Sequence, residues 1–450
     1  MSEAFGRALK VGTRRVCDSL RTLKSLGDPG CLLTSPTLPP QEVDVAAARH
    51  GSTRLSSTTM SSLPIPDAQF DIAIVGVGIA GAAMAYFCAE HARVLLLERE
   101  GQPGMHSTGR SAAMFMESYG PPQVRSLTRA SRPFFESPPA CFGTAPLIVP
   151  RGALSIGSAA QRVQLQALHE QLRAEGCPAE LLSAAAAAAL VPVLRAEAAA
   201  AAVLDPLACD LDVHALHQGF LRGARARGAV LACDSEVLHL SPTARGWDIE
   251  TAAGRHHAAV VVNAAGAWVD ELAGRAGVAP IGIQPRRRSA FVFAPPEGLA
   301  THGWPAVSDL DESFYFKPDA GLLLGSPANA DPVLPHDVLP EEWDIALGIA
   351  RIETATTLRI VRPRRSWAGL RSFVADGDLV GGAEPLAPGF FWIAALGGYG
   401  IQTSPAMAAI CAAKLLGRQR PDWCAAADAL APTLALRRPP PAIPTLPSQD

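Results

Sequence analysis

DIAIVGVGIAGAAMAYFCAEHARVLLLE, residues 71–98, is the stretch that decides the fold of this 450-residue chain. Residues 71–75 form a short apolar run that predicts a strand, and a glycine turn then leads into a helix of small residues that runs to about residue 91. A second apolar strand, residues 94–97, follows. The order strand, glycine turn, helix, strand predicts two parallel strands joined by a helix, which is the beginning of an α/β domain with a parallel sheet.

Three glycines and one acid in this stretch fit the binding site of a dinucleotide. Gly76, Gly78 and Gly81 form the pattern G-x-G-x-x-G, and Glu98 follows Gly76 by 22 positions. In such a site the first glycine permits a tight turn, the second lets the backbone approach a pyrophosphate, and the third lets the helix pack closely on the strand. The acid accepts hydrogen bonds from a ribose. A glycine turn in some other parallel sheet is the alternative, and the stretch alone does not distinguish FAD from NAD.

Composition excludes several classes of partner. The chain is 48% hydrophobic and 18% charged, with a formal net charge of -3 and a pI near 6.4, which argues against nucleic acid and anionic membranes. The cysteines are scattered and include no C-x-x-C, and the histidines lack ligand spacing, so neither a disulfide framework nor a metal site is expected. A reducing, cytoplasmic location fits this pattern. No integral membrane segment is expected, because no window reaches about 18 uninterrupted apolar residues.

The two ends of the chain differ in composition from the rest. Residues 1–66 are rich in Arg, Ser, Thr and Pro and lack periodicity over most of their length, which predicts a disordered leader. A targeting leader and a wrongly assigned start are alternatives, because Met60 lies just upstream of the first strand. Residues 421–450 predict a Pro-rich tail.

Between these ends the pattern of strands and helices changes twice. We expect a discontinuous, Rossmann-like nucleotide-binding domain made of residues 67–146, 205–278 and 363–420. A β-rich α+β substrate domain is expected from residues 147–204 and 279–362, where strands alternate between apolar and polar positions.

Two further segments suit contact with a ligand. The loop after Glu98 is dense in hydrogen-bond donors, notably in HSTGRS (residues 106–111), and a plain surface loop is the alternative. Near the C-terminus, the apolar run FFWIAAL leads into a second glycine turn, residues 397–400, which begins a helix of small residues. The N-terminal dipole of that helix would stabilise negative charge on a ligand.

Three consecutive arginines precede a strand of the expected substrate domain. Strict alternation places Arg288 on the same strand face as Ala290 and Val292. An arginine on an apolar face requires an anionic partner, either from the protein or from a substrate. For at least one of its neighbours, Arg286 or Arg287, a solvated surface charge is the expected role.

Longer strings carry a family resemblance over about residues 70–416. They include HSTGRSAA (106–113), ALHQGFLRG (215–223), WAGLRSFVADGDLV (367–380) and GGYGIQTS (397–404). With the motifs above, the chain resembles the superfamily of FAD enzymes that contains glycine oxidase and D-amino-acid oxidase, and it is similar to the bacterial D-arginine dehydrogenases within it. The resemblance implies FAD rather than NAD, and a discontinuous FAD domain with a β-rich substrate domain over the flavin.

The resemblance also implies roles for individual residues. Arg288 and Arg371 match two arginines that clamp a substrate carboxylate, and Tyr119 and Tyr315 match tyrosines near the reacting amino group. The implied reaction transfers the α-hydrogen of an amino acid as hydride to flavin N5, and hydrolysis of the imino acid gives a 2-oxo acid and ammonia. Oxygen or a quinone would then accept the electrons. The residues expected to contact FAD are Gly76, Gly78, Gly81, Glu98, Arg99, His106, Ser107, Thr108, Arg110, Ser111, Ala112, Gly266, Gly369, Gly398, Gly400, Ile401 and Gln402.

The expected substrate side-chain pocket departs from the D-arginine enzymes. Ala153 replaces a glutamate, and Met114 and Met116 replace a histidine and a threonine, with Glu117 nearby. Loss of the carboxylate removes the main attraction for a cationic side chain, and two methionines make a pocket apolar and adaptable. We therefore expect neutral, apolar D-amino acids as substrates, unless Glu117 points inward and restores binding of cationic ones.

Two other functions remain open at this point. The same fold and carboxylate clamp would serve an oxidase or dehydrogenase of a secondary amino acid such as sarcosine, of glycine or proline, or of a 2-hydroxy acid. A flavin-binding protein without catalytic activity is the third possibility, because the replaced histidine would lie near the reaction centre.

Overall fold

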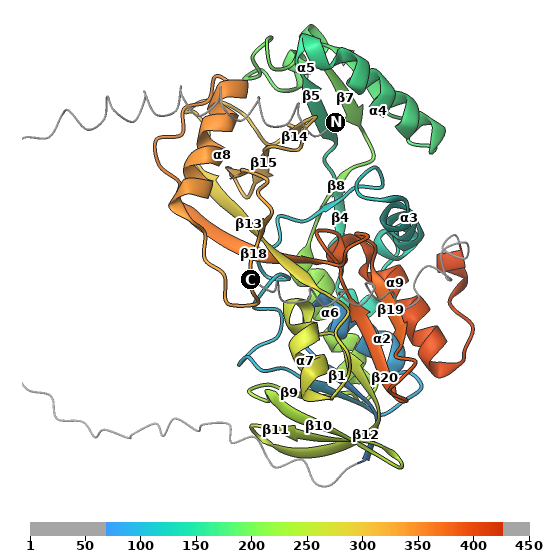
Figure 1. Ribbon diagram of the computed structural model, residues 1–450. Helices are drawn as coiled ribbons and strands as arrows, with labels where there is room; N and C mark the ends of the chain where they lie inside the picture. Colours follow the sequence, from blue (N-terminus) through green and yellow to red (C-terminus); the bar gives the residue numbers. More distant parts are fainter. Residues whose placement is uncertain (1–68, 426–450) are drawn as a thin grey trace, which may run out of the picture. The chain divides into compact units, whose positions relative to one another are not determined.

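The structure is a computed structural model, which describes residues 69–425 (Figure 1). The expected leader, residues 1–66, lies outside the described residues, and so does the expected tail beyond residue 425. Within the described part of the chain, every helix is too short or too polar to cross a membrane.

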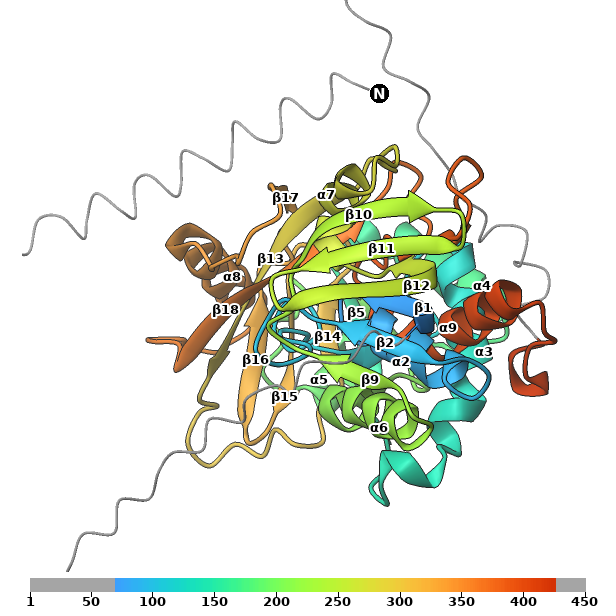
Figure 2. The ribbon, with the colours of Figure 1, turned by 90° about the horizontal axis from the view of Figure 1, so that it is seen from below.

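An eight-stranded sheet contains both strands of the stretch at residues 71–98 (Figure 2). Its strands are β1 (Gln69–Val75), β2 (Val94–Leu97), β9 (Val230–Ala232), β10 (Val237–Thr243), β11 (Gly246–Thr251), β12 (Gly254–Asn263), β19 (Val380–Ala383) and β20 (Phe390–Ala394). Their order is β10, β11, β12, β1, β2, β9, with β20 also paired to β12 and β19 to β20. The neighbours β9, β2, β1, β12 and β20 are parallel, whereas β10, β11 and β19 pair antiparallel. The predicted parallel α/β sheet is therefore confirmed.

Helices and apolar clusters cover both faces of this sheet. The first face carries α2 (Ile79–Cys88), α3 (Pro122–Glu136), α6 (Val213–Ala226) and α9 (Gly400–Leu416), and the second carries α7 (Val269–Arg275). Ile72 and Ile74 of β1 pack into the first cluster, whereas Ala73 and Val75 pack into the second. A strand buried on both faces needs apolar residues at successive positions, which explains why residues 72–75 form a continuous apolar run.

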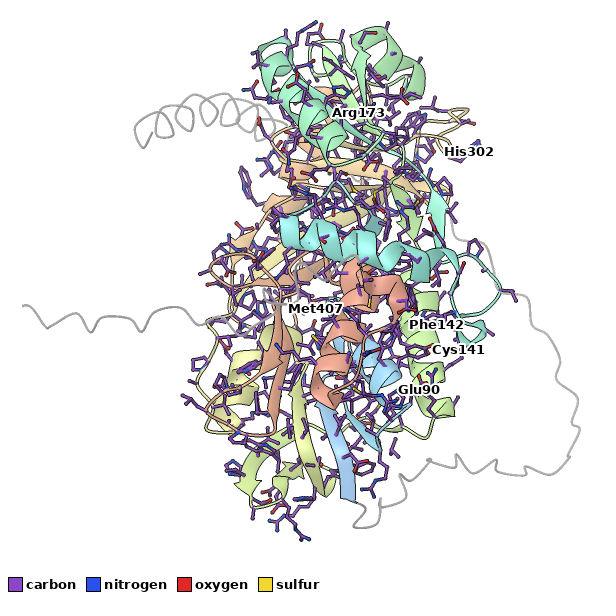
Figure 3. The ribbon with its side chains drawn as sticks, turned by 90° about the vertical axis from the view of Figure 1, so that its right-hand side faces the viewer. Glu90, Cys141, Phe142, Arg173, His302 and Met407 are labelled. Atoms are coloured by element: carbon purple, nitrogen blue, oxygen red, sulfur yellow. The ribbon has the colours of Figure 1, made fainter. Side chains whose placement is uncertain are left out.

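Small residues in α6 let aromatic side chains pack against it. A Cβ on Gly219 would lie 2.1 Å from the Phe142 ring, and a Cβ on Gly223 would lie 3.1 Å from the Cys141 sulfur. Figure 3 labels both neighbours, and also Met407 of α9, which is buried in the same cluster. The glycines of α6 are thus required by packing rather than by a turn.

A nine-stranded sheet forms the second layer of the fold. Its strands are β5 (Ala153–Gly157), β6 (Glu180–Ser183), β7 (Ala201–Asp205), β13 (Gln284–Phe293), β14 (Ala306–Asp309), β15 (Tyr315–Asp319), β16 (Leu322–Ser326), β17 (Asp331–Pro332) and β18 (Arg365–Phe373). The order is β17, β13, β16, β15, β14, β5, β7, β6, and β18 pairs with β13. The expected boundary at residue 363 assigned β18 to the nucleotide-binding domain, but its hydrogen bonds place it in this second sheet.

The two faces of the second sheet differ in chemistry. One face is apolar and includes Phe291, Phe293 and Phe316, and it packs against α5 (Ala184–Leu190) and α8 (Glu342–Ala355). α4 (Arg162–Ala174) packs separately against β7, through a smaller cluster. Arg288 and Ala290 of β13 lie on the opposite face and line a cavity. The alternation predicted around Arg288 therefore agrees with the structure.

A three-stranded sheet lies between the two large ones (Figure 1). It consists of β3 (Met114–Phe115), β4 (Ile148–Pro150) and β8 (Cys209–Leu211), with β8 in the centre and both pairings antiparallel. β8 follows β7 of the second sheet and precedes α6 of the first sheet, so this small sheet joins the two layers.

Candidate active site

The turn between β1 and α2 has no room for side chains at two of its three glycines. Gly76 has a φ of +94°, and a Cβ there would lie 2.6 Å from the Ala264 carbonyl oxygen. A Cβ on Gly81 would lie 2.0 Å from the Gly76 carbonyl oxygen. A Cβ on Gly78, at the start of α2, would meet only the Thr108 hydroxyl, at 3.2 Å. Packing thus requires the first and third glycines, whereas at the second the absence of a side chain lets a ligand approach the backbone at the N-terminus of α2.

Glu98 and His217 hold this turn in place. One carboxylate oxygen of Glu98 accepts a 2.9 Å hydrogen bond from the Val77 amide, and the other accepts a 3.2 Å bond from the Glu100 amide. The Nε2 atom of His217 donates to the Val77 carbonyl oxygen at 3.0 Å, and burial lowers the pKa of this histidine. Each oxygen of Glu98 keeps a further lone pair, so its geometry is compatible with the expected ribose contact.

One cavity connects the glycine turn to the second sheet. Its wall includes the ends of β1 and β2, the loop of residues 104–112, residues 264–268, part of β18 and the second glycine turn. The expected FAD contacts in this wall are Gly76, Gly78, Glu98, Arg99, His106, Ser107, Thr108, Arg110, Ser111, Ala112, Gly266, Gly369, Gly398, Gly400 and Ile401. Gly81 and Gln402 lie outside the wall. The cavity thus joins segments that are far apart in the sequence.

Side chains of the loop after β2 also fix the loop itself. The Thr108 hydroxyl accepts a 3.0 Å hydrogen bond from the Ile79 amide in the first turn of α2. The Ser107 hydroxyl donates to the Leu370 carbonyl of β18 at 2.6 Å. Arg110 donates to the Met105 carbonyl within the loop, and to two backbone carbonyls and an aspartate outside it. The loop is therefore held between α2 and β18, a role that its abundance of donors did not predict.

A stacked group lies in the cavity wall close to Glu98. The Arg99 guanidinium carbon is 4.1 Å from the centroid of the Trp268 ring, and the His106 ring is 4.8 Å from that ring. The Glu100 carboxylate binds His106 at 2.8 Å and Arg99 at 2.9 Å, and these two hydrogen bonds lower the pKa of Glu100. Trp268 had no expected role, and its stacking with Arg99 leaves no signal in the local sequence.

Gln402 carries an unfilled hydrogen-bond donor beside the second glycine turn. Its Oε1 accepts a 3.0 Å bond from the Met116 amide, but its buried Nε2 has no partner among residues 69–425. A buried donor without a partner costs about 1–3 kcal/mol, so a ligand atom is its natural partner. At Gly266, φ is +58° and a Cβ would meet no atom within 4 Å, which leaves space on the cavity side. Together with the glycine turn at the start of α2 and the cavity that joins this turn to the second sheet, these features fit a long, phosphate-bearing cofactor such as FAD.

Arg288 of β13 and Arg371 of β18 both line the cavity. Within the described part of the chain, neither guanidinium forms an ion pair with an acid; the third arginine, Arg287, binds Asp344 at 2.9 Å instead. The Nε atom of Arg288 donates to a backbone carbonyl, that of Asn329, at 2.6 Å. Burial, and then the charge of Arg371, lower the pKa of Arg288. Two neighbouring, partly buried cations that pair with no acid among residues 69–425 favour a bound anion, and a carboxylate is the simplest one.

Three tyrosines surround this arginine pair. Tyr315 begins β15 and lines the cavity, and Tyr119 interacts with the Arg371 side chain. Tyr399, which was not among the expected site residues, packs edge-on against Tyr119 with ring centroids 5.2 Å apart. Burial and the neighbouring Tyr119 raise the pKa of Tyr399 to about 12. Its position within the second glycine turn, GGYG, was the signal that could have identified it.

The residues expected to shape the substrate side-chain pocket lie outside the cavity wall. Met114 is in β3, and the amide of Met116 binds Gln402 as described above. Ala153 begins β5 and is 8% exposed. The Glu117 carboxylate forms an ion pair with Arg132 of α3. Glu117 therefore has a cationic partner within the protein.

Known proteins resemble this chain over most of its described length. A model of the family DAO, FAD dependent oxidoreductase, matches residues 71–414. Sarcosine oxidase subunit beta from Rhizobium meliloti (strain 1021) is 26% identical over 377 residues, which cover 81% of this chain and 88% of that protein. Glycine oxidase from Geobacillus kaustophilus (strain HTA426) is 26% identical over 351 residues, or 75% of this chain and 90% of that protein.

Solved structures share the fold. The crystal structure of glycine oxidase from Geobacillus kaustophilus has a TM-score of 0.70 at 23% identity, and the match covers 82% of this chain and 99% of that chain. An L-alpha-glycerophosphate oxidase from Mycoplasma pneumoniae, with FAD bound, also has a TM-score of 0.70, at 18% identity over 79% of this chain and 97% of that chain. A particular similarity to D-arginine dehydrogenases stays a prediction. The chain belongs to the DAO family of FAD-dependent oxidoreductases.

Proposed function

We propose that the protein oxidises the Cα–N bond of an α-amino acid whose carboxylate is bound by Arg288 and Arg371. The observation that carries this proposal is a pair of guanidiniums in the wall of the cavity that fits FAD, neither of which has an acidic partner among the described residues. A guanidinium fork matches a planar carboxylate in two parallel hydrogen bonds. The names of two relatives, glycine oxidase and sarcosine oxidase subunit beta, also refer to α-amino acids.

In this proposal bound FAD takes up the two electrons of the oxidised bond. The two arginines fix the carboxylate, and thereby restrict the substrate to one orientation at the cavity wall. Tyr119 and Tyr315 offer hydroxyl groups to the amino group, or to a water beside it. Tyr399, with a pKa of about 12, keeps its proton at neutral pH and can act only as a neutral hydrogen-bonding group. Binding and orientation are thus the contributions of this chain.

We place D-amino acids with neutral, apolar side chains first among the substrates. The departure from the D-arginine dehydrogenases supports this order: Ala153 carries no charge and Met114 and Met116 are polarizable and adaptable, although all three lie outside the wall of the cavity. The ion pair between Glu117 and Arg132 supports this choice, because it occupies the carboxylate that would otherwise attract a cation.

Small secondary amino acids are the second candidate. Sarcosine oxidase subunit beta and glycine oxidase, both similar over three quarters or more of this chain, favour it. The carboxylate clamp would be the same, and only the volume left for the side chain and the N-substituent would differ.

Anaerobic reduction of the bound flavin by a panel of amino acids tests these alternatives. The panel contains D-Leu, D-Met, D-Phe, D-Arg, glycine and sarcosine. The L-enantiomers of the chiral compounds are the matched controls. We expect the apolar D-amino acids to bleach the flavin absorbance fastest. Bleaching by sarcosine alone supports the second candidate, D-Arg as the fastest substrate contradicts the proposed side-chain preference, and no bleaching by any compound contradicts the proposed reaction. Admission of air then shows whether oxygen accepts the electrons.

A further inference from the structure

Two aspartates lie on either side of the turn between β7 and β8, in the segment DPLACD (residues 205–210). Asp205 is 4% exposed and ends β7. Its Oδ2 accepts a 2.5 Å hydrogen bond from the Ser118 hydroxyl, and its Oδ1 accepts a 2.9 Å bond from the Leu207 amide. The Cys177 thiol also donates to Oδ1, at 3.4 Å. Both oxygens of this buried carboxylate are therefore engaged.

Asp210 binds two cations. Its Oδ1 accepts a 2.8 Å hydrogen bond from the Lys317 ammonium, and its Oδ2 lies 2.6 Å from Nη2 and 2.7 Å from Nε of Arg151. Lys317 is 6% exposed, which is unusual for a lysine and requires such a partner. In the small sheet, Asp210 also pairs with Met114.

The partners of these two acids are neighbours of the tyrosines at the arginine pair. Ser118 directly precedes Tyr119 in the sequence. Lys317 follows Tyr315 by two positions in β15, so the two side chains lie on the same face of the strand. The turn at residues 205–210 is thus bonded to both segments that carry these phenols, although they are almost 200 residues apart in the chain.

We propose that Asp205 and Asp210 are positioning residues that fix the separation of the Tyr119 and Tyr315 hydroxyl groups. The proposal rests on the proposed function, in which these hydroxyls hold the amino group of the substrate. Neither acid lies in the wall of the cavity that contains the arginine pair, and all four of their carboxylate oxygens accept hydrogen bonds within the protein. The acids therefore act through Ser118 and Lys317.

Removal of the Ser118 hydroxyl tests the Asp205 half with little risk to folding. In Ser118→Ala we expect the limiting rate of anaerobic flavin reduction to fall about tenfold, since small misplacements of a reacting group cost up to 100-fold. The apparent Kd of the substrate should change less than threefold, because Arg288 and Arg371 are untouched. Ser118→Thr, which keeps the hydroxyl, should restore most of the rate. Leu172→Ala, a core truncation in α4, is the control that lowers stability without lowering the rate.

A second measurement does not depend on turnover. The chain contains four tyrosines, so 3-fluorotyrosine labelling should give four ¹⁹F signals, which single Tyr→Phe variants assign. We expect Ser118→Ala to shift the Tyr119 signal and Asp210→Asn to shift the Tyr315 signal, while the Tyr86 signal stays in place. Unchanged Tyr119 and Tyr315 signals overturn the proposal. If no amino acid reduces the flavin of the wild-type protein, the proposed function is contradicted instead. The ¹⁹F spectra then still show whether Asp205 and Asp210 position the two tyrosines.

Discussion

The glycine turn of the first sheet and the arginine pair of the second sheet are completed in opposite ways. In the turn, backbone atoms fill the space beside Gly76 and Gly81, and Glu98 bonds the amide of Val77, so this region is complete without a ligand. Arg288, by contrast, lies near a second cation, Arg371, and neither forms an ion pair with an acid among the described residues. The first region is built by packing and the second by unbalanced charge. Substitutions should therefore damage folding and FAD retention in the first region, and substrate binding in the second.

Gly81→Ala should have the largest effect. The added Cβ would lie 2.0 Å from the Gly76 carbonyl oxygen, so β1 and α2 must separate. Overpacking of this kind costs about 3 kcal/mol or more, and we expect little soluble, FAD-bound protein. Gly274→Ala in α7 is the matched control, because a Cβ there meets no atom within 4 Å. FAD content and thermal unfolding of the two variants measure the difference, and equal FAD content in both would show that the turn tolerates a side chain.

Arg288→Met should leave FAD binding intact but weaken the substrate. Loss of one member of a buried charge pair costs roughly 3 kcal/mol, or about 100-fold in affinity. The readout is the substrate concentration that gives half-maximal anaerobic flavin reduction. Arg365→Met, on the exposed part of β18, is the control and should behave like wild type. If the substrate reduces the flavin of Arg288→Met at the same concentrations as in the wild-type protein, Arg288 does not bind the substrate carboxylate.

Ala153→Glu should change substrate preference by a smaller factor. A carboxylate at the start of β5 would restore the charge that is expected to attract cationic side chains, and we expect the ratio of D-Arg to D-Leu reduction rates to rise about tenfold. Ala153→Gln keeps the size of the new side chain without its charge and serves as control. Equal ratios in the two variants would mean that charge at this position does not select the substrate.

The smallest effect should come from pH acting on His217. Burial lowers its pKa, so the folded protein binds fewer protons than the unfolded chain once the pH falls below about 6.5, the ordinary value for histidine. Its contribution to stability is therefore present above that pH and declines as the pH falls towards the lowered pKa. We expect thermal stability to fall between neutral pH and pH 5.5, and His217→Gln to show a smaller fall. Parallel pH profiles of the two proteins would assign the effect to other groups.

Local sequence patterns were sufficient to predict the glycine turn, but they were insufficient to predict the whole site around the arginine pair. The roles of Gly76 and Gly81 follow from their spacing, although the Ala264 carbonyl oxygen beside Gly76 comes from a distant part of the chain. The alternation around Arg288 also predicted its face correctly. β18 was assigned to the other domain because strand pairing between residues 284–292 and 365–373 has no local signature.

Long-range contacts of side chains explain the residues that were missed. The bond from Lys317 to Asp210 and the bond from Ser118 to Asp205 join segments about 90 to 110 residues apart, and neither pair forms a motif. Thr108 and Arg110 lie in a donor-rich loop, but which of their polar groups face a ligand and which bind α2 or β18 depends on the fold.

Titration of the FAD-bound protein with benzoate and with benzamide tests the central claim, a carboxylate clamp at the cavity that fits FAD. The flavin absorbance spectrum reports binding, and the two compounds differ only in the charge of the group offered to Arg288 and Arg371. We expect benzoate to perturb the spectrum, benzamide to do so far more weakly, and Arg371→Met to lose the benzoate response while keeping its FAD. Equal binding of the two compounds, or an unchanged benzoate response in Arg371→Met, would contradict the account.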